Sequence, residues 1–575
     1  MQFSSRQIQA KTGLRVTRDV AFILLNLFIF FNEANATVVP GAADVGRIAP
    51  PLRKPAFDHS RDSEVTTPAL LPSAQVPEAA KTIHFTLKKI KIEGASAFSE
   101  ERLSSAYASY IGKDISLDAV WGVASTITAR YQDAGYLLSR AYVPEQRIRN
   151  GTVIIKIVEG YVGKVELNDP ISGRLAVKGL IARLQEKRPI TASEMESFLL
   201  RINDLPGVSF RAVLSSAEDA VADEAAVKLT LLPSKKENKG SITFDNSGSR
   251  FLGPNETSAS YQASLLPLQQ TSVSALSSLP AKELKYASLS HAVALAPNVT
   301  MELEGNVTKA RPGYTLERFD INSQSLSAGA GLHYQWIRQR KENLALKFTV
   351  SGKNTTSDLT AHTPLTRDRI RTLRAGVSYD FTDKHGGYNV VNTAVTQGVD
   401  GFGSSKKGAR NLSRAEASPD FTKVTVQASR QQSITEDWSV LASASGQLAS
   451  GPLYSSEEFG YGGQTFGRAY DASEMTGDRG VSGALEVQYN KWSEWKPVGL
   501  TPYGFYDVGK VWNEDAGQAK SAAGSSTGFG VRFAAPARLS GNLGLAFPLV
   551  RDISTPIYGG GKNGPRVLLQ FSKEF

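Results

Sequence analysis

Residues 373–381 read Leu-Arg-Ala-Gly-Val-Ser-Tyr-Asp-Phe, so that apolar and polar side chains alternate along the stretch. The same alternation recurs at residues 344–351 and at residues 301–308. One apolar face and one charged face, repeated over segments of about ten residues, are typical of a barrel that faces lipid outside and a wet lumen inside. A soluble β-sandwich also alternates, but it carries fewer inward charges. Residues 236–575 therefore predict a transmembrane antiparallel β-barrel of about 16 strands, at roughly 20 residues per strand with its connection.

The composition narrows the class of protein and of functional site. The chain has 575 residues and no cysteine, so it holds no disulfide framework, thiolate metal site or cysteine nucleophile. Its 50 glycines and 19 tyrosines against 4 methionines favour a β-rich protein. After the N-terminus no apolar run reaches the ~18 residues of a membrane-spanning helix. The net charge of +10 is spread along the chain in no single basic stripe, so nucleic acid is not an expected partner.

The N-terminus has the three parts of a secretory signal peptide. Basic residues, an apolar core from Val20 to Phe31 and the sequence Ala34-Asn35-Ala36 follow one another. The apolar core is too short for a membrane anchor, so residues 1–36 predict a signal peptide that is cleaved after Ala36. An exported barrel of this kind belongs in the outer membrane of a Gram-negative cell.

Residues 37–82 form a proline-rich segment without an amphipathic helix pattern. Proline fixes φ and removes a backbone donor, so the segment cannot form a long helix and predicts an extended or mobile linker. The prolines are Pro40, Pro50, Pro51, Pro55, Pro68, Pro72 and Pro77.

Residues 83–160 and 161–235 indicate two tandem α/β units of about 75 residues each. Each reads as a strand, two helices and two further strands, and the first closes with Asn150-Gly151, the strongest short turn signal. The second contains a capping box, Thr191 with Glu194. Two unrelated α/β domains are the alternative to a repeat. In the first unit, helices are expected from Ser99 to Ile111 and from Ser116 to Gly135.

A connection of about thirty residues, 451–480, separates two predicted strands of the barrel. Connections of this length are usually functional or disordered. Its centre, residues 462–471, holds a single arginine, Arg468, among glycines and aromatic residues. We expect Arg468 to reach into the barrel and meet a carboxylate, because guanidinium and carboxylate groups pair bidentately. A solvated loop arginine is the alternative.

Asp507 is the candidate carboxylate in the barrel. It shares one face of a predicted strand with Tyr503, Phe505 and Gly509. An aspartate that faces a wet lumen is tolerated, and an arginine that neutralises it lowers the free-energy cost further.

The α/β units contain stretches that resemble polypeptide-transport-associated (POTRA) domains. Residues 141–160 are similar to the closing hairpin of such a domain, and residues 201–208 to the end of its second helix. Neither unit shows a catalytic constellation. Each offers a strand edge and a groove beside a helix, which suit the capture of an extended polypeptide by strand addition. A spacer is the alternative role.

The long loop resembles the lumen loop of the barrel-and-POTRA transporters and assembly factors of the outer membrane. That loop has a Val-Arg-Gly-Tyr/Phe tip, and here the tip reads Phe466-Gly467-Arg468-Ala469-Tyr470. Arg468 and Tyr470 match the family pattern, whereas Gly467 and Ala469 depart from it. The resemblance implies that the loop folds into the lumen and that Arg468 contacts Asp507, close to Gly509, on the barrel wall.

Further motifs resemble two-partner secretion transporters of the haemolysin secretion and activation type (TpsB). There are two POTRA-like units, where assembly factors usually have more, and Asp245 and Asn246 match that family's first-strand motif. The sequence Gly-Asp-Arg-Gly closes the long loop at residues 477–480. The final strand ends at Phe575, similar to the signal by which barrels are recognised for insertion, although Lys573 departs from that signal.

The resemblance implies protein export as the function. The expected client is a large unfolded exoprotein of the TpsA type, an adhesin, cytolysin or toxin, and the other expected partners are outer-membrane lipid and the barrel-assembly machinery. No cofactor and no metal are expected, and residues 462–469 match a nucleotide-binding P-loop poorly. An assembly factor that inserts other barrels is the alternative. An enzyme is not expected, because none of the six histidines has a serine elbow or a metal-spaced partner nearby.

Overall fold

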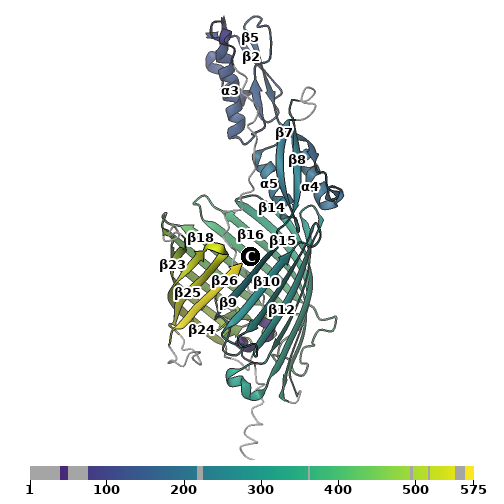
Figure 1. Ribbon diagram of the computed structural model, residues 1–575, viewed down its shortest axis with the longest axis vertical. Helices are drawn as coiled ribbons and strands as arrows, with labels where there is room; N and C mark the ends of the chain where they lie inside the picture. Colours follow the sequence, from purple (N-terminus) through teal and green to yellow (C-terminus); the bar gives the residue numbers. More distant parts are fainter. Residues whose placement is uncertain are drawn as a thin grey trace, which may run out of the picture.

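The computed structural model describes residues 39–48, 76–216, 224–360, 363–491, 497–515, 519–550 and 564–575. These form two α/β units that follow one another outwards from one rim of a β-barrel (Figure 1). The predicted signal peptide and its cleavage site after Ala36 lie outside the described residues. No helix in the described part of the chain is long and apolar enough to cross a membrane. Nor do these residues hold a group of three or more His, Cys, Asp or Glu side chains that could bind a metal ion.

In the first unit a three-stranded sheet packs against one long helix. The central strand β5 pairs with β2 in parallel and with β4 antiparallel. The helix α3 covers the sheet because Val120, Ile127 and Tyr131 recur at helical spacing and are fully buried. The elements are η3 (Glu78–Lys81), β1 (His84–Thr86), β2 (Lys89–Glu93), α2 (Glu100–Ser104), η4 (Ala108–Tyr110), β3 (Asp114–Ser116), α3 (Leu117–Asp133), β4 (Arg140–Tyr142) and β5 (Thr152–Val158).

Two local expectations for this unit have different outcomes. The predicted Asn150-Gly151 turn is present: both residues have positive φ, 52° and 69°, as a tight hairpin turn of that sequence requires. The helix expected through Ile111 is shorter, since α2 ends at Ser104. The chain must turn back there, with Gly112 at φ 80°, so that β3 can pair with β1. Tertiary pairing therefore overrides the helical spacing.

The second unit has the same arrangement. Its central strand β8 pairs with β6 in parallel and with β7 antiparallel, and two helices cover one face. The expected capping box is present, because the side chains of Thr191 and Glu194 each accept a hydrogen bond from the backbone amide of the other residue. The elements are β6 (Tyr161–Glu166), η5 (Pro170–Gly173), α4 (Leu175–Gln185), α5 (Ala192–Asp204), β7 (Val208–Ser216) and β8 (Ala226–Lys235).

The rest of the described chain forms a closed barrel of 16 strands, each antiparallel to both neighbours, as predicted. The first strand closes against the last, β9 against β26. The strands are β9 (Lys239–Asp245), β10 (Glu256–Ala263), β11 (Gln269–Ser278), β12 (Leu284–Ala296), β13 (Val299–Ala310), β14 (Asn322–Arg338), β15 (Glu342–Leu359), β16 (Thr363–Thr382), β17 (Tyr388–Gly398), β18 (Thr422–Ser433), β19 (Trp438–Ala449), β22 (Arg479–Tyr489), β23 (Gly499–Trp512), β24 (Ser521–Ala535), β25 (Leu539–Pro548) and β26 (Arg566–Glu574).

The two faces of the barrel wall differ in burial as well as in polarity. On β16, Leu373 and Val377 are exposed on the outside, whereas Asp368 and Thr372 on the opposite face are almost completely buried. The apolar face therefore points away from the protein, as a lipid-facing band does. The polar face is buried in this half of the strand because other parts of the chain occupy the lumen there, whereas Arg374 and Ser378 further along the same face are exposed.

Ionic contacts attach the second α/β unit to the barrel rim. Arg338, at the end of β14, donates from Nε and Nη2 to the carboxylate of Asp204 at 2.5 and 3.1 Å. From α5, the guanidinium of Arg201 donates to the backbone carbonyls of Gln335 and Trp336 at 2.9 and 3.0 Å. These contacts place the helix-bearing end of the unit directly over the turn between β14 and β15 (Figure 1).

Glu159 should make the stability of the first unit depend on pH. Burial opposes ionisation of this carboxyl, but hydrogen bonds from the amides of Ala97 and Ser96 and from the Tyr131 hydroxyl outweigh it and hold its pKa below the ordinary value. The stabilisation is therefore present above the ordinary glutamate pKa and is lost as the pH falls through the lower value. Hydrogen exchange of α3 amides in the full chain should show this loss.

Glu159→Gln should weaken protection of α3 by about 1.5–3 kcal/mol and flatten the pH dependence, because it removes charge-assisted hydrogen bonds. Glu145→Gln, at an exposed position of the same unit, is the matched control and should change neither quantity. Equal protection in both variants would contradict the role given to Glu159.

Candidate functional site in the barrel lumen

The connection between β19 and β22 folds back into the barrel. Within it, β20 (Phe459–Tyr461) and β21 (Met475–Gly477) form a short hairpin that the sequence pattern did not indicate. Gly467 makes the tip possible: its φ is 72°, and a Cβ there would lie 2.7 Å from the Tyr461 ring. Tyr470 is fully buried and donates its hydroxyl to the Ser525 carbonyl of β24 at 3.1 Å.

The structure brings Arg468 and Asp507 together. The backbone amide and Nε of Arg468 each donate to Asp507 Oδ2 at 3.0 Å, and Nη2 donates to Oδ1 at 2.8 Å. The guanidinium also stacks over the Phe505 ring, with 3.5 Å between its central carbon and the ring centroid. Arg468 is 8% exposed and Asp507 is 0% exposed, so the alternative of a solvated loop arginine is excluded by the geometry.

Two further charges complete this cluster. Glu486 on β22 accepts from Arg468 Nη1 at 2.6 Å and from Arg532 Nη1, on β24, also at 2.6 Å. Buried charges are stable only when they are paired and hydrogen-bonded, and here two arginines face two carboxylates. The cluster spans three neighbouring strands, β22, β23 and β24, and so fixes the loop tip against one side of the wall.

Gly509 has a steric role at the same wall. A Cβ at Gly509 would lie 2.1 Å from the ring of Tyr461, which comes from the loop hairpin. The aromatic ring thus lies directly on the backbone of β23. Together with Tyr470 and Met475 it forms an apolar cluster between the loop and the wall.

Asp471, next to the predicted tip, connects the loop to the closure of the barrel. Its Oδ2 accepts from Arg250 Nε at 2.5 Å, and its Oδ1 accepts from Arg566 Nη1 at 3.1 Å. Arg250 follows the first strand and Arg566 begins the last one. Arg566 Nη2 also donates to the carbonyls of Asn246 and Gly248 at 3.3 and 3.1 Å.

The residues of the first-strand and C-terminal motifs meet at this closure. Asn246 donates to the Val567 carbonyl at 2.9 Å and accepts from the Leu569 amide at 2.8 Å, extending the ladder beyond Asp245. Asp245 itself accepts from the Ser247 amide at 2.9 Å. At the opposite end, Phe575 exchanges backbone hydrogen bonds with Gly240, at 2.9 and 3.0 Å, and its ring lies on that glycine.

The expectation of a linker throughout residues 37–82 is wrong for residues 41–47, and also for residues 78–81, where η3 belongs to the first unit. Residues 41–47 form two short 3₁₀ turns, η1 (Gly41–Ala43) and η2 (Val45–Arg47), inside the barrel at the end far from the α/β units (Figure 1). Val45 packs with Leu252 and Leu284, and Gly46 has room for no side chain beside Ser456. The segment is too short for an amphipathic pattern, which is why the sequence did not indicate it.

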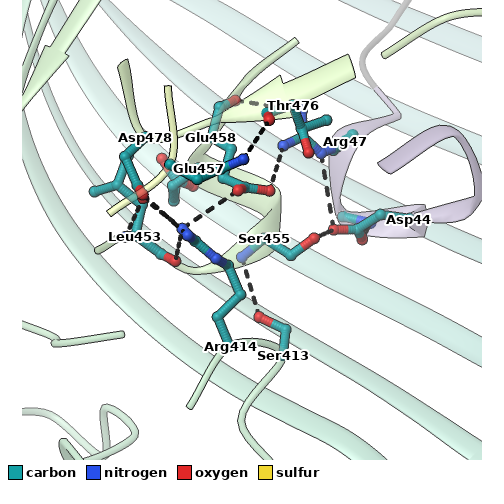
Figure 2. A network of polar contacts seen from close by, with 12 residues as sticks. Asp44, Arg47, Ser413, Arg414, Leu453, Ser455, Glu457, Glu458, Thr476 and Asp478 are labelled. Atoms are coloured by element: carbon teal, nitrogen blue, oxygen red, sulfur yellow. Dashed lines mark hydrogen bonds and ion pairs between the residues drawn. The ribbon is translucent and has the colours of Figure 1, made fainter. Parts of the chain in front are cut away.

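A second ionic cluster joins this N-terminal segment, the lumen loop and the extracellular loop 399–421 (Figure 2). Glu458 of the lumen loop lies 3.1 Å from Arg47 Nη2 and 3.3 Å from Arg414 Nη1. The Ser455 hydroxyl donates to Asp44 at 2.6 Å. Glu458 is therefore shared between Arg47 of the N-terminal segment and Arg414 of the loop 399–421.

Asp478 holds the base of the lumen loop in the same cluster. Arg414 binds its carboxylate through both terminal nitrogens, with Nη2 2.9 Å from Oδ2, and the Leu453 amide donates to it at 2.7 Å. Asp478 is 0% exposed and Arg414 is 2% exposed. The sequence motif at residues 477–480 thus contributes its aspartate to a buried pair (Figure 2).

Several partners in these clusters were missed at the sequence level. Glu486 and Arg532 could have been found from the sequence, because each lies on the inward-facing side of a strand next to the strand of Asp507. No sequence pattern points to Arg414, Asp44 or Arg47, since each comes from a loop or turn whose position only the folded barrel determines.

Comparisons with known proteins agree with this architecture. Residues 223–531, more than half of the chain, match the family model described as haemolysin secretion/activation protein ShlB/FhaC/HecB. Residues 85–160 match the model of a POTRA domain of the ShlB type.

Individual relatives are similar over most of their length. The heme/hemopexin transporter protein HuxB of Haemophilus influenzae (strain 86-028NP) is 24% identical over 478 residues, 79% of this chain and 81% of the relative. The outer membrane transporter CdiB of Dickeya dadantii (strain 3937) is 22% identical over 77% of this chain and 80% of its own. Among solved structures, CdiB from Escherichia coli has the same fold, with a TM-score of 0.65 and 18% identity over 88% of this chain and 94% of that one.

Replacing Asp507 by alanine should strongly destabilise the barrel, because Arg468 would stay buried without its bidentate partner. Breaking a buried pair in this way typically costs about 3–5 kcal/mol. Urea unfolding of the purified protein in detergent measures the change. Asp437→Ala removes a loose, exposed ion pair with Lys491 at 3.8 Å and should change stability by less than about 0.5 kcal/mol. Equal unfolding midpoints for the two variants would contradict the buried-pair interpretation.

Proposed function

The chain belongs to the haemolysin secretion/activation family, and from this membership we propose that it exports one large, unfolded exoprotein from the periplasm to the cell surface. It is an outer-membrane β-barrel transporter with periplasmic POTRA domains. The observation that supports an exporter most directly is the content of the lumen. A loop and an N-terminal segment occupy it, and ionic contacts together with separate apolar clusters, rather than one continuous apolar core, hold them there.

The two α/β units suit the capture of an extended client. Each three-stranded sheet has its central strand, β5 or β8, paired on both sides, which leaves an outer edge on β2, β4, β6 and β7. An unfolded segment adds to such an edge through main-chain hydrogen bonds, whatever its sequence. We infer that residues 83–235 receive the N-terminal region of a TpsA-like adhesin, cytolysin or toxin.

The Arg468 cluster gives the lumen loop a defined resting position. Its groups are charged, so they exchange partners with water or with a polar polypeptide at little net free-energy change once the lumen is wet. An entering client then displaces the loop, and the four charges restore it afterwards. Export on this scheme proceeds without nucleotide hydrolysis and is driven by folding of the client outside the cell.

Arg468→Ala should abolish or strongly reduce secretion while the barrel still inserts. The variant loses the fixed position of the loop, but Glu486 keeps Arg532 as a partner. Asp507 keeps the hydrogen bond from the Ser526 hydroxyl at 3.2 Å, and the released loop lets lumen water solvate its carboxylate. Exoprotein in the culture medium is measured by immunoblot, and insertion by heat-modifiable mobility in outer-membrane fractions. Lys347→Ala, which removes a wall ion pair with Glu302, is the matched control and should secrete normally. Unchanged secretion by Arg468→Ala would contradict the proposal, and a client that stays embedded in the membrane would favour an assembly factor.

A disulfide between the N-terminal segment and the lumen loop should block export reversibly. Asp44 and Ser455 are in side-chain contact at 2.6 Å, and the native chain has no cysteine, so Asp44→Cys with Ser455→Cys introduces one defined cross-link. We expect secretion to stop under oxidising conditions and to resume with a reductant. Each single cysteine variant controls for the loss of the polar contact. Normal secretion by the fully cross-linked protein would show that these two segments need not separate.

A further inference from the structure

The outer face of β16 changes from apolar to basic at its extracellular end. Every second residue from Leu373 to Phe381 points outwards and is apolar or aromatic, and Arg371 and Arg369 continue the same row. The apolar part covers about 26 Å along the strand, at roughly 3.3 Å per residue. At the usual tilt this corresponds to about 20 Å across the membrane, close to the band of about 25 Å found in such barrels. The two arginines therefore lie at the extracellular border of the lipid-facing band.

The positive charge of these arginines is held in place but not neutralised. Arg371 donates to Asn354 Oδ1 at 2.9 Å and to the Phe402 carbonyl at 3.1 Å, and Arg369 is exposed. Within the described ranges neither arginine forms an ion pair with a carboxylate, whereas their neighbour Arg367 pairs with Asp358 at 2.8 Å. Two uncompensated guanidinium groups, of which that of Arg371 is fixed by hydrogen bonds, thus face the surroundings of the barrel.

Phe402 lies beside these arginines and has no burial within the chain. It is 89% exposed, the most exposed large apolar side chain of the described residues, and its φ is 50°. A bulky residue in the left-handed region is strained, and no packing inside the protein compensates for that strain. The strand holds the loop firmly, since the Ser405 amide donates to the Arg369 carbonyl at 2.8 Å and the Arg369 amide donates to Ser405 Oγ at 2.9 Å. The position of the Phe402 backbone is therefore set by the wall, and its ring projects from there.

We propose that Arg369, Arg371 and Phe402 form a binding site for the phosphorylated glycolipid of the outer leaflet, the lipid A class. Guanidinium groups bind phosphate through paired, charge-assisted hydrogen bonds. An aromatic ring at the membrane border packs against the acyl chains, as the aromatic girdles of barrels do. Exposed Lys407 and Arg410 of the same loop add positive potential around the site.

The site has a connection to the lumen through its loop. The extracellular loop 399–421 carries Phe402 near one end and the buried Arg414 near the other, where Arg414 binds Asp478 and Glu458. A lipid that fixes the outer part of this loop also fixes the segment from which Arg414 enters the barrel.

Binding of purified full-length protein to three probes tests the proposal: bisphosphorylated lipid A in mixed micelles, the same lipid with its phosphates removed, and inorganic phosphate. Native mass spectrometry gives occupancy, and thermal unfolding gives stabilisation. We expect the wild type to bind the bisphosphorylated lipid at least about tenfold more tightly than the dephosphorylated one, measured as the ratio of the two dissociation constants. Inorganic phosphate should not stabilise the protein. Equal affinity for both lipids, or equal stabilisation by inorganic phosphate, would overturn the assignment.

Variants separate the contributions of charge and ring. Arg369→Gln with Arg371→Gln should reduce binding of bisphosphorylated lipid A to the level of the dephosphorylated lipid. Arg369→Gln alone leaves every hydrogen bond of Arg371 in place and should still weaken binding. The matched control is Arg479→Gln, at the same border but paired with Glu514, which should bind as the wild type does.

For the ring, Phe402→Gly removes the strain at φ 50° and should raise the thermal midpoint in lipid-free detergent while weakening binding of both lipids. Wild-type lipid affinity in Phe402→Gly, or in the double arginine variant, would overturn the proposal.

Discussion

The structure depends on a constraint that follows from burying charge: an arginine in the filled lumen is tolerated only where carboxylates neutralise it. Arg468 meets this condition with Asp507 on the wall. Arg414 of the extracellular loop meets it with Asp478 at the base of the lumen loop, and Arg566 at the closure of the barrel meets it with Asp471. Each pairing joins segments that are far apart in the sequence. The lumen loop is thus positioned by charge at three points, and its shape follows from where the opposite charges stand on the strands.

Ionic pairing allows the lumen content to be ordered at rest and still to move. A plug with a continuous apolar core would be stable, but removing it would expose the core to water. An ionic plug loses less free energy of interaction when it separates from the wall, because water and polar peptide groups solvate the released charges. The apolar contacts of the loop and of the N-terminal segment fall into three separate clusters, represented by Tyr461, by Tyr454 and by Val45, rather than into one continuous core. The lumen content can therefore be specific in position and still be displaced by a polypeptide.

Much of this could be predicted from the sequence, and the limits have physical reasons. Strand alternation with a period of two predicted the barrel, since the two faces meet different solvents all along each strand. The contact between Arg468 and Asp507 was anticipated from motif position, and Asn150-Gly151 from its turn chemistry. The length of the first helix was overestimated, because strand pairing ends it at Ser104. The position of residues 41–47 inside the barrel was missed, because two short turns carry no periodic signal. Contacts such as Arg414 with Asp478 depend on loop paths that local patterns do not encode.

The pairing of the first strand with the last also bears on how the barrel forms. The first and last strands share five register pairs, and the ladder is completed by backbone bonds between Gly240 and the terminal residue, Phe575. A molecule in which β26 does not pair with β9 would keep every other strand pair of the barrel and yet leave both edges of the sheet open. Such edges are templates for aggregation. The pairing of β9 with β26 is therefore the step that turns an adhesive open sheet into a ring without free edges.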